Sequence, residues 1–270
     1  AGDASPATTA HPKATMNFPD LAGRVAVVTG GARGIGYSLA SALARQGTSV
    51  ALLDLLPDVA DSARRLAADT GARTAAAVVD VTDPASVEAA FAHARDELGV
   101  ADVLITAAGI TIWGDAAEVD PAVWNKVVDV NLNGTFYATQ SFARPLIAEG
   151  RTGSAILISS MSGRIANIPQ HQASYNASKA AVDHLATSLA VEWAPAIRVN
   201  AIAPGYILSD MTRQFTEANP ELATEWVGMI PAGRMGEPDD LHGVVLLLAS
   251  SASSYLTGQT LVVDGGYTAI

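Results

Sequence analysis

The sequence contains no cysteine and no run of basic residues. Without cysteine, neither a disulfide framework nor thiolate catalysis is available, and a reducing compartment such as the cytoplasm is the expected location. The 16 lysines and arginines are outnumbered by 27 aspartates and glutamates, so the formal net charge is -11. An acidic chain without a basic patch is a poor partner for nucleic acid or for an anionic membrane surface.

Long apolar runs are also missing. The apolar stretch Val244–Ala249 is far shorter than the about 18 residues that a membrane helix needs. The first 20 residues are rich in Ala, Thr and Pro and lack the apolar core of a signal peptide. We expect residues 1–19 to be a flexible N-terminal extension, with Met16 as a candidate native start. Hydrophobic residues make up 49% of the chain and charged residues 16%, which predicts a packed domain over residues 20–270.

Short apolar runs rich in β-branched residues alternate with longer helical patterns. The expected strands are 24–29, 49–54, 74–80, 103–106, 155–159, 198–203 and 261–264, and the expected helices are 35–45, 60–68, 84–98, 121–147 and 173–193. The pattern predicts an α/β protein: a single-domain, doubly wound, seven-stranded parallel sheet with helices on both faces. Segment 206–234, which contains Pro220 and Pro231, interrupts this pattern, and we expect it to cover a substrate.

A glycine-rich turn, Thr29–Gly36, joins the first expected strand to the first expected helix. Gly30 permits the tight turn, while Gly34 and Gly36 let a pyrophosphate and the sheet approach the helix closely. Ile35 and its neighbours begin the helix, whose free N–H groups would face the negative charge. The spacing Gly-x-x-x-Gly-x-Gly differs from that of most dinucleotide folds, but the strand-to-helix position favours a dinucleotide site over a simple turn.

An acidic residue, Asp54, ends the second expected strand. A carboxylate there can accept both ribose hydroxyls of adenosine and repel a 2′-phosphate, which favours NAD over NADP. Arg33 inside the turn acts in the opposite sense, because it could pair with a 2′-phosphate, but Asp54 would face the ribose directly. The alternative for Asp54 is a solvated turn residue. Further candidate contacts with the cofactor follow the third and fourth strands: Asp80, Val81, Ala108 and Gly109.

Tyr175 and Lys179 lie four residues apart on an expected helix and therefore share one face. A free tyrosine has a pKa of about 10, and a lysine ammonium one turn away favours the phenolate, so the pair is a candidate acid/base. Ser160, just past the fifth strand, could hold a substrate oxygen. Asn131 is a poor helix former inside an expected helix, which suggests that it holds a water linking Lys179 to solvent. Taken alone, Tyr-x-x-x-Lys is common on ordinary helices.

In this order the motifs resemble those of the short-chain dehydrogenases/reductases, over residues 20–270. The resemblance implies a Rossmann fold and hydride transfer between a nicotinamide cofactor and an alcohol or ketone. It implies Tyr175 as acid/base, Lys179 as the residue that lowers its pKa and binds the nicotinamide ribose, Ser160 as the substrate-orienting serine and Asn131 as the fourth relay member. Implied nicotinamide contacts are Pro204, Gly205, Ile207 and Ser209.

The resemblance also implies a homotetramer. Some relatives hold magnesium near the C-terminus, but nothing in this sequence demands a metal. Two features depart from the family pattern. The usual Asn-Ala-Gly is here Ala107-Ala108-Gly109, and the loop between Ser160 and Tyr175 is slightly longer than in many members.

The loop 163–172, with 203–206 and 262–267, resembles the polyol branch of the family, which includes galactitol- and sorbitol-type dehydrogenases. Its substrates are sugar alcohols, ketoses or vicinal diols. Neutral groups suited to a polyhydroxyl chain are available here, and Trp113 and Tyr206 could form apolar walls. The amide and imidazole side chains of the loop are Asn167, Gln170, His171 and Gln172, and the substrate-binding candidates are Ser160, Asn167, Gln170, Tyr175 and Tyr206. The alternative is that these amides satisfy only the loop backbone.

Two rival functions share these motifs. A 3-oxoacyl-carrier-protein reductase would prefer NADPH and usually shows basic residues for its acidic carrier, so the acidic charge and Asp54 argue against it. A non-catalytic regulator that senses NAD would typically lose the tyrosine or the lysine, and this chain keeps both Tyr175 and Lys179.

Overall fold

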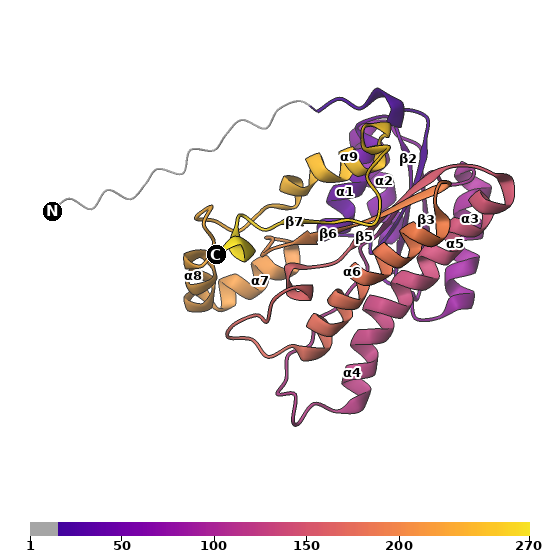
Figure 1. Cartoon of the computed structure of the whole chain (residues 1–270). Helices are drawn as coiled ribbons and strands as arrows, with labels where there is room; N and C mark the ends of the chain where they lie inside the picture. Colours follow the sequence, from indigo (N-terminus) through magenta and orange to yellow (C-terminus); the bar gives the residue numbers. More distant parts are fainter. Residues whose placement is uncertain (1–15) are drawn as a thin grey trace, which may run out of the picture.

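A seven-stranded parallel sheet in the order β3-β2-β1-β4-β5-β6-β7 forms the centre of the protein (Figure 1). The computed structural model describes residues 16–270, apart from three side chains between positions 210 and 214, so residues 1–15 of the expected extension lie outside the described residues. The strands are β1 (Val25–Thr29), β2 (Ser49–Asp54), β3 (Thr74–Val78), β4 (Val103–Thr106), β5 (Gly153–Ile158), β6 (Ile197–Pro204) and β7 (Thr260–Val263). The predicted doubly wound α/β class is confirmed.

Helices cover both faces of this sheet. One face carries α1 (Gly34–Ala44), α2 (Val59–Thr70) and α9 (His242–Ala249), and the other carries α3 (Pro84–Leu98), α5 (Gly134–Glu149) and α6 (Ala173–Trp193). The central strands are apolar at nearly every position because alternate residues enter opposite cores. In β5, for example, Ile156 packs with α1 and α9, whereas Leu157 packs with α5 and α6.

Several expected boundaries agree with the structure, including those of β2, β4, α3 and α6. The helix expected over 121–147 is one helical run, but it divides into α4 (Pro121–Val128), a π-helical turn (Asp129–Asn133) and α5. The excursion 206–234 contains two helices, α7 (Asp210–Ala218) and α8 (Pro220–Gly228), which were not predicted from the sequence. Strand β3 is shorter than expected and ends at Val78, so Asp80 lies in the following loop rather than at a strand end.

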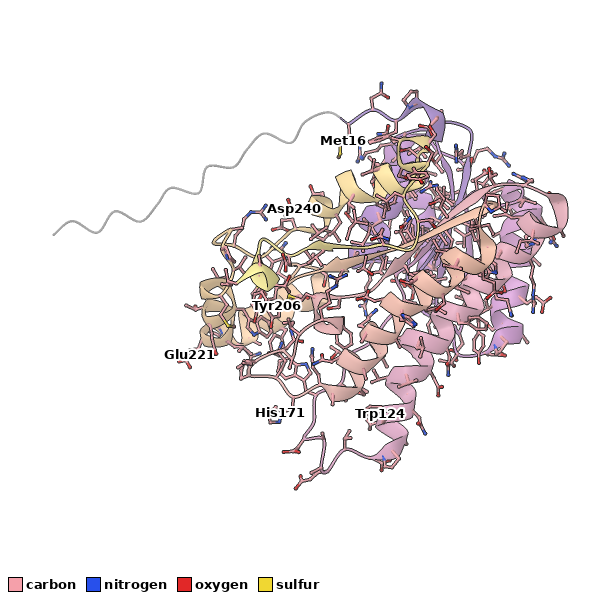
Figure 2. The ribbon with its side chains drawn as sticks, viewed as in Figure 1. Met16, Trp124, His171, Tyr206, Glu221 and Asp240 are labelled. Carbon is pink, nitrogen blue, oxygen red and sulfur yellow. The ribbon has the colours of Figure 1, made fainter. Side chains whose placement is uncertain are left out.

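Residues 16–19 of the expected extension contact the domain. Gln46 accepts a hydrogen bond from the Phe18 N–H (2.8 Å) and donates one to the Met16 carbonyl (3.1 Å), so its amide holds the chain before η1, the 3-10 turn Pro19–Leu21. Figure 2 labels Met16 where the described chain begins.

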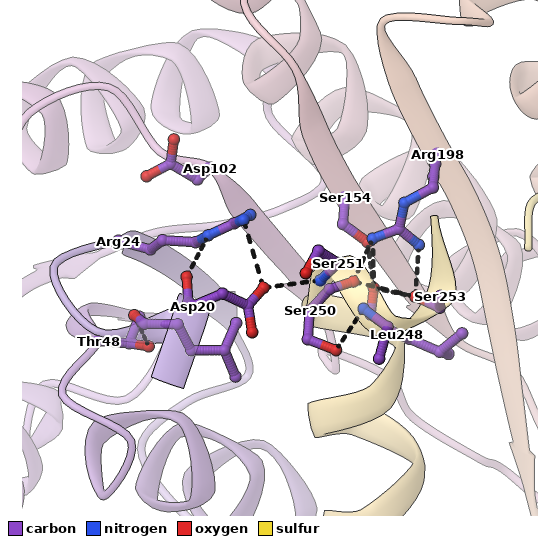
Figure 3. A network of polar contacts seen from close by, with 12 residues as sticks. Asp20, Arg24, Thr48, Asp102, Ser154, Arg198, Leu248, Ser250, Ser251 and Ser253 are labelled. Atoms are coloured by element: carbon purple, nitrogen blue, oxygen red, sulfur yellow. Dashed lines mark hydrogen bonds and ion pairs between the residues drawn. The ribbon is translucent and has the colours of Figure 1, made fainter. Parts of the chain in front are cut away.

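A polar network joins β5, β6 and the end of α9 (Figure 3). Arg198 on β6 donates to the carbonyls of Leu248 (2.8 Å) and Ser250 (3.1 Å) and to the Ser253 hydroxyl (2.8 Å). Ser154 on β5 donates to the same Leu248 carbonyl (2.7 Å). These bonds satisfy carbonyls at the C-terminus of α9, which have no partner within the helix. They lie near the amino ends of the strands, whereas the cavity described below lies at the carboxyl ends.

Candidate active site

The residues that follow β1, β4, β5 and β6 surround one cavity of about 520 Å³. Strand order reverses between β1 and β4, and ligands of doubly wound sheets bind outside the carboxyl ends of the strands at such a point. Of the predicted residues, the cavity lining includes Ile35, Gly109, Ser160, Asn167, Gln170, Tyr175, Lys179, Pro204, Gly205, Tyr206, Ile207 and Ser209. The structure therefore brings together side chains that lie more than 170 positions apart in the sequence.

Ser160, Tyr175 and Lys179 meet because a turn after β5 packs against α6. Ser160 begins the 3-10 turn Met161–Gly163 and accepts a hydrogen bond from the Ser162 N–H (3.1 Å). A Cβ on Gly163 would lie 2.8 Å from the backbone of Lys179, so only glycine allows this close approach. Lys179 is buried and its Nζ donates to the Ile158 carbonyl (2.8 Å), 5.7 Å from the centre of the Tyr175 ring.

Burial controls the protonation of this pair. It raises the pKa of the Tyr175 phenol above its ordinary value, and a hydrogen bond with Ser160 acts in the opposite direction. It also lowers the pKa of Lys179 from 10.5 to about 8, while the Asp183 carboxylate opposes this shift. The sequence had led us to expect a lowered phenol pKa. Within the chain itself this expectation is not met, because desolvation of the phenolate outweighs the stabilising groups.

Asn131 lies in the π-helical turn and is fully buried. Its Oδ1 accepts from the Ile110 N–H (2.8 Å), and its Nδ2 donates to the Ile110 carbonyl (3.0 Å) and to the Ser178 hydroxyl (3.0 Å). The side chain thus joins the loop after β4 to α6. Gly109 lies between Asn131 and Lys179: a Cβ there would be 3.3 Å from Asn131 Oδ1 and 3.5 Å from Lys179 Nζ. Single π-helical turns inside α-helices occur frequently at functional sites.

The glycine turn after β1 packs closely against the loop after β4. A Cβ on Gly30 would lie 2.6 Å from the Ala108 N atom, and a Cβ on Gly36 would overlap the Gly30 carbonyl oxygen. No side chain caps the N-terminus of α1, so the first N–H groups of this helix are available to an anion. Ser209, which caps α7, lies next to Gly34. These features fit a dinucleotide pyrophosphate.

Asp54 is held in place at the end of β2. Its Oδ2 accepts from the Ala32 N–H and its Oδ1 accepts from the Leu56 N–H, both at 3.0 Å. Each oxygen keeps a second lone pair that can accept a ribose hydroxyl. The side chain of Arg33 is exposed at the turn.

Asp80 and Val81 lie further along the edge of the sheet. Asp80 is exposed. Its carboxylate accepts hydrogen bonds from the Thr82 hydroxyl (2.7 Å) and the Thr82 N–H (2.9 Å), and these bonds lower the pKa of the Asp80 carboxyl. Val81 is buried against the start of α5, where a Cβ on Gly134 would lie 2.8 Å from its Cγ2. Neither residue lines the cavity, and their contact with a cofactor stays a prediction.

The amide-rich loop forms the far wall of the cavity. Gln170 (2.9 Å) and Asn167 (3.4 Å) both donate to the Tyr206 hydroxyl, and Gln172 donates to Asn167 Oδ1 (2.9 Å). These amides thus bond one another and Tyr206. His171 is exposed and does not line the cavity; Figure 2 shows it on a peripheral loop, away from Tyr206.

An aromatic cluster completes this wall. The Trp226 ring is stacked on Tyr206, with centroids 4.4 Å apart, and Phe215 lies on it at 5.7 Å. Trp113 meets Phe215 and Trp226 edge-on. Phe215 and Trp226 were not among the residues predicted from the sequence. The available signal was the spacing of Leu222, Ala223, Trp226 and Val227, which places apolar residues on one face of a helix.

Among the side chains that the structure describes in residues 16–270, no group of three or more His, Asp or Glu could hold a metal ion. In the same part of the chain, every helix is too short or too polar to span a bilayer.

Comparison with known proteins identifies the family. The family described as enoyl-(acyl carrier protein) reductase matches residues 30–268. A galactitol 2-dehydrogenase (L-tagatose-forming) from Cereibacter sphaeroides is 44% identical over 250 residues, covering 92% of this chain and 96% of the relative. A crystal structure of a short-chain type dehydrogenase/reductase from Mycobacterium marinum is 38% identical, with a TM-score of 0.88 over 94% of this chain and 98% of that one. The chain belongs to the short-chain dehydrogenase/reductase family.

Membership makes the chain an oxidoreductase that acts on CH–OH groups with a nicotinamide cofactor. A third relative of the same family is a gluconate 5-dehydrogenase from Burkholderia cenocepacia, solved in complex with NADP and tartrate. It is 36% identical, with a TM-score of 0.87 over 94% of this chain and 98% of that one. The relatives therefore act on polyhydroxylated compounds of more than one kind.

Proposed function

We propose that this short-chain dehydrogenase/reductase is an NAD-dependent enzyme that interconverts a secondary alcohol and a ketone on a sugar alcohol, ketose or vicinal diol. The observation that carries the proposal is the cavity in which Ser160, Tyr175 and Lys179 face a wall of neutral amides and aromatic rings. The 44% identity with a galactitol 2-dehydrogenase supports the substrate class.

In the oxidation direction, Ser160 and Tyr175 hold the substrate hydroxyl and Tyr175 takes its proton. The nicotinamide, when bound, supplies the hydride acceptor. Lys179 is fixed by its bond to the Ile158 carbonyl, and below its pKa of about 8 its positive charge lies close to the phenol and favours the phenolate. Asn131, with a water, connects Lys179 to solvent. Because burial raises the pKa of Tyr175, oxidation should become faster as the pH rises above neutrality.

The preference for NAD rests on Asp54. Two backbone N–H groups hold its carboxylate at the end of β2, so it cannot rotate away from a ribose. A 2′-phosphate placed there would meet a fixed negative charge, and like charges in a partly buried site repel strongly. The exposed Arg33 is the group that would favour NADP instead.

Initial rates with NAD and NADP, over sugar alcohols and small diols at mildly alkaline pH, test this proposal. We expect turnover of polyols with NAD, and a loss of about a thousandfold or more in kcat for Tyr175→Phe with dinucleotide binding retained. Tyr255→Phe is the control, because this tyrosine is fully exposed. A fully active Tyr175→Phe enzyme would refute the assignment of the acid/base. Reduction of keto esters with NADPH and no turnover of polyols would favour the rival function, that of a 3-oxoacyl-carrier-protein reductase.

A further inference from the structure

Two buried polar atoms in the wall of the cavity have no hydrogen-bond partner. Among the described residues, four buried side-chain atoms lack one: Thr106 Oγ1, Gln170 Oε1, Asp183 Oδ1 and Trp226 Nε1. Gln170 and Trp226 line the active-site cavity, and they are 6% and 3% exposed. Native proteins leave few such atoms unpaired, because a buried polar atom without a partner loses the hydrogen bonds that it makes with water in the unfolded chain. An acceptor and a donor therefore lie in the same wall without partners.

Contacts with neighbouring side chains hold both residues in place. Gln170 Nε2 donates to the Tyr206 hydroxyl, which sets the orientation of the amide. Trp226 is stacked between Tyr206 and Phe215, with interplanar angles of 11° and 19°. The indole N–H lies in the plane of the ring, so neither stacked neighbour can accept its hydrogen bond. Because Tyr206 contacts both residues, the two side chains belong to one part of the wall.

The chemistry of this pair indicates what it can bind. Gln170 Oε1 needs a donor and Trp226 Nε1 needs an acceptor, and a hydroxyl group is both. A carboxylate can only accept, so it would leave Gln170 unpaired. Of the described residues that line the cavity, Lys179 alone is a lysine or arginine, and its Nζ bonds the Ile158 carbonyl beside the reacting groups. Nothing in the amide-rich wall would therefore neutralise an acid.

We propose that Gln170 and Trp226 form a subsite for a hydroxyl at the unreactive end of the substrate, which selects sugar alcohols and ketoses over sugar acids of the same length. This inference rests on the proposed function of Ser160 and Tyr175. Both unpaired atoms are shielded from water, so a substrate hydroxyl reaches them only with a small displacement of Gln170 or of α8. A bound polyol then satisfies a donor and an acceptor that the protein leaves unpaired.

The test compares Trp226→Phe with the wild type on three substrates: a six-carbon sugar alcohol, the aldonic acid of the same length, and 2,3-butanediol, which lacks the far end. Phenylalanine keeps a stacking ring and removes only the N–H donor. We expect kcat/KM to fall about tenfold for the sugar alcohol and less than twofold for butanediol. The preference for the sugar alcohol over the aldonic acid should fall in Gln170→Met, because a hydroxyl can donate to Gln170 Oε1 and a carboxylate cannot.

Trp124→Phe is the matched control, because it makes the same change at a tryptophan on α4. Figure 2 shows Trp124 at a distance from Tyr206. This substitution should leave kcat/KM unchanged on all three substrates. Gln170→Met is measured in the same way, so that a poorly folded Trp226→Phe protein does not decide the outcome. Equal losses on the sugar alcohol and butanediol in both variants, or no loss in either, would overturn the subsite. Failure of the proposed function would be visible earlier, as a wild-type enzyme that turns over no polyol, and would overturn the subsite as well.

Discussion

Replacement of Lys179 by methionine should change how the stability of the protein depends on pH. Burial lowers the pKa of Lys179 from 10.5 to about 8 in the folded state. Between these two values the unfolded chain binds more protons than the folded one, so the free energy of unfolding increases as the pH rises. Below pH 8 the folded protein bears the whole cost of the buried charge. From the two pKa values, linkage gives an increase of about 2 kcal/mol in the free energy of unfolding between pH 7 and 9.5.

The Lys179→Met protein lacks this titrating group, so the wild type should gain about 2 kcal/mol relative to it over the same pH interval. Urea unfolding at fixed protein concentration, in steps from pH 7 to 9.5, measures the difference. The series stops at pH 9.5 because the raised pKa of Tyr175 gives the opposite dependence above about pH 10.

Lys126→Met is the matched control, since it makes the same substitution at a lysine that is exposed on α4 and removes no buried charge. A difference between the wild type and Lys179→Met that stays constant within about 0.5 kcal/mol would refute the reasoning, because it would mean that Lys179 titrates alike in both states.

Three further substitutions test other parts of the structure. Gly36→Ala places a Cβ against the Gly30 carbonyl, so dinucleotide affinity measured by fluorescence titration should fall more than tenfold; unchanged affinity would contradict the packing of the turn. Asp54→Asn removes the negative charge at the ribose, and the ratio of kcat/KM for NAD to that for NADP should fall about tenfold; an unchanged ratio would assign the selectivity to Arg33. Arg198→Met removes the donors to the end of α9 and should lower the free energy of unfolding by about 2 kcal/mol in urea with kcat retained; normal stability with lost activity would contradict its placement.

Features that depend on nearby residues could be predicted from the sequence. The doubly wound sheet follows from alternating apolar strands and helices, and α6 runs over Ala173–Trp193 as expected. The tight turn after β1 could be predicted because its conformation depends on missing side chains. The i, i+4 spacing of Tyr175 and Lys179 places them on one face of α6 whatever surrounds that helix.

Features that depend on distant residues required the tertiary structure. The direction of the Tyr175 pKa shift results from how much water the packed structure excludes, and helical spacing alone does not report this. Trp226 became a candidate only when folding stacked it on Tyr206, twenty positions earlier in the chain. Asn131 bonds Ile110 and Ser178 across two other elements, which no local pattern specifies. The sequence by itself determined most of the elements and the candidate reactive groups. The tertiary structure decided their burial and pairing, because desolvation and hydrogen bonding depend on every residue that packs around a group.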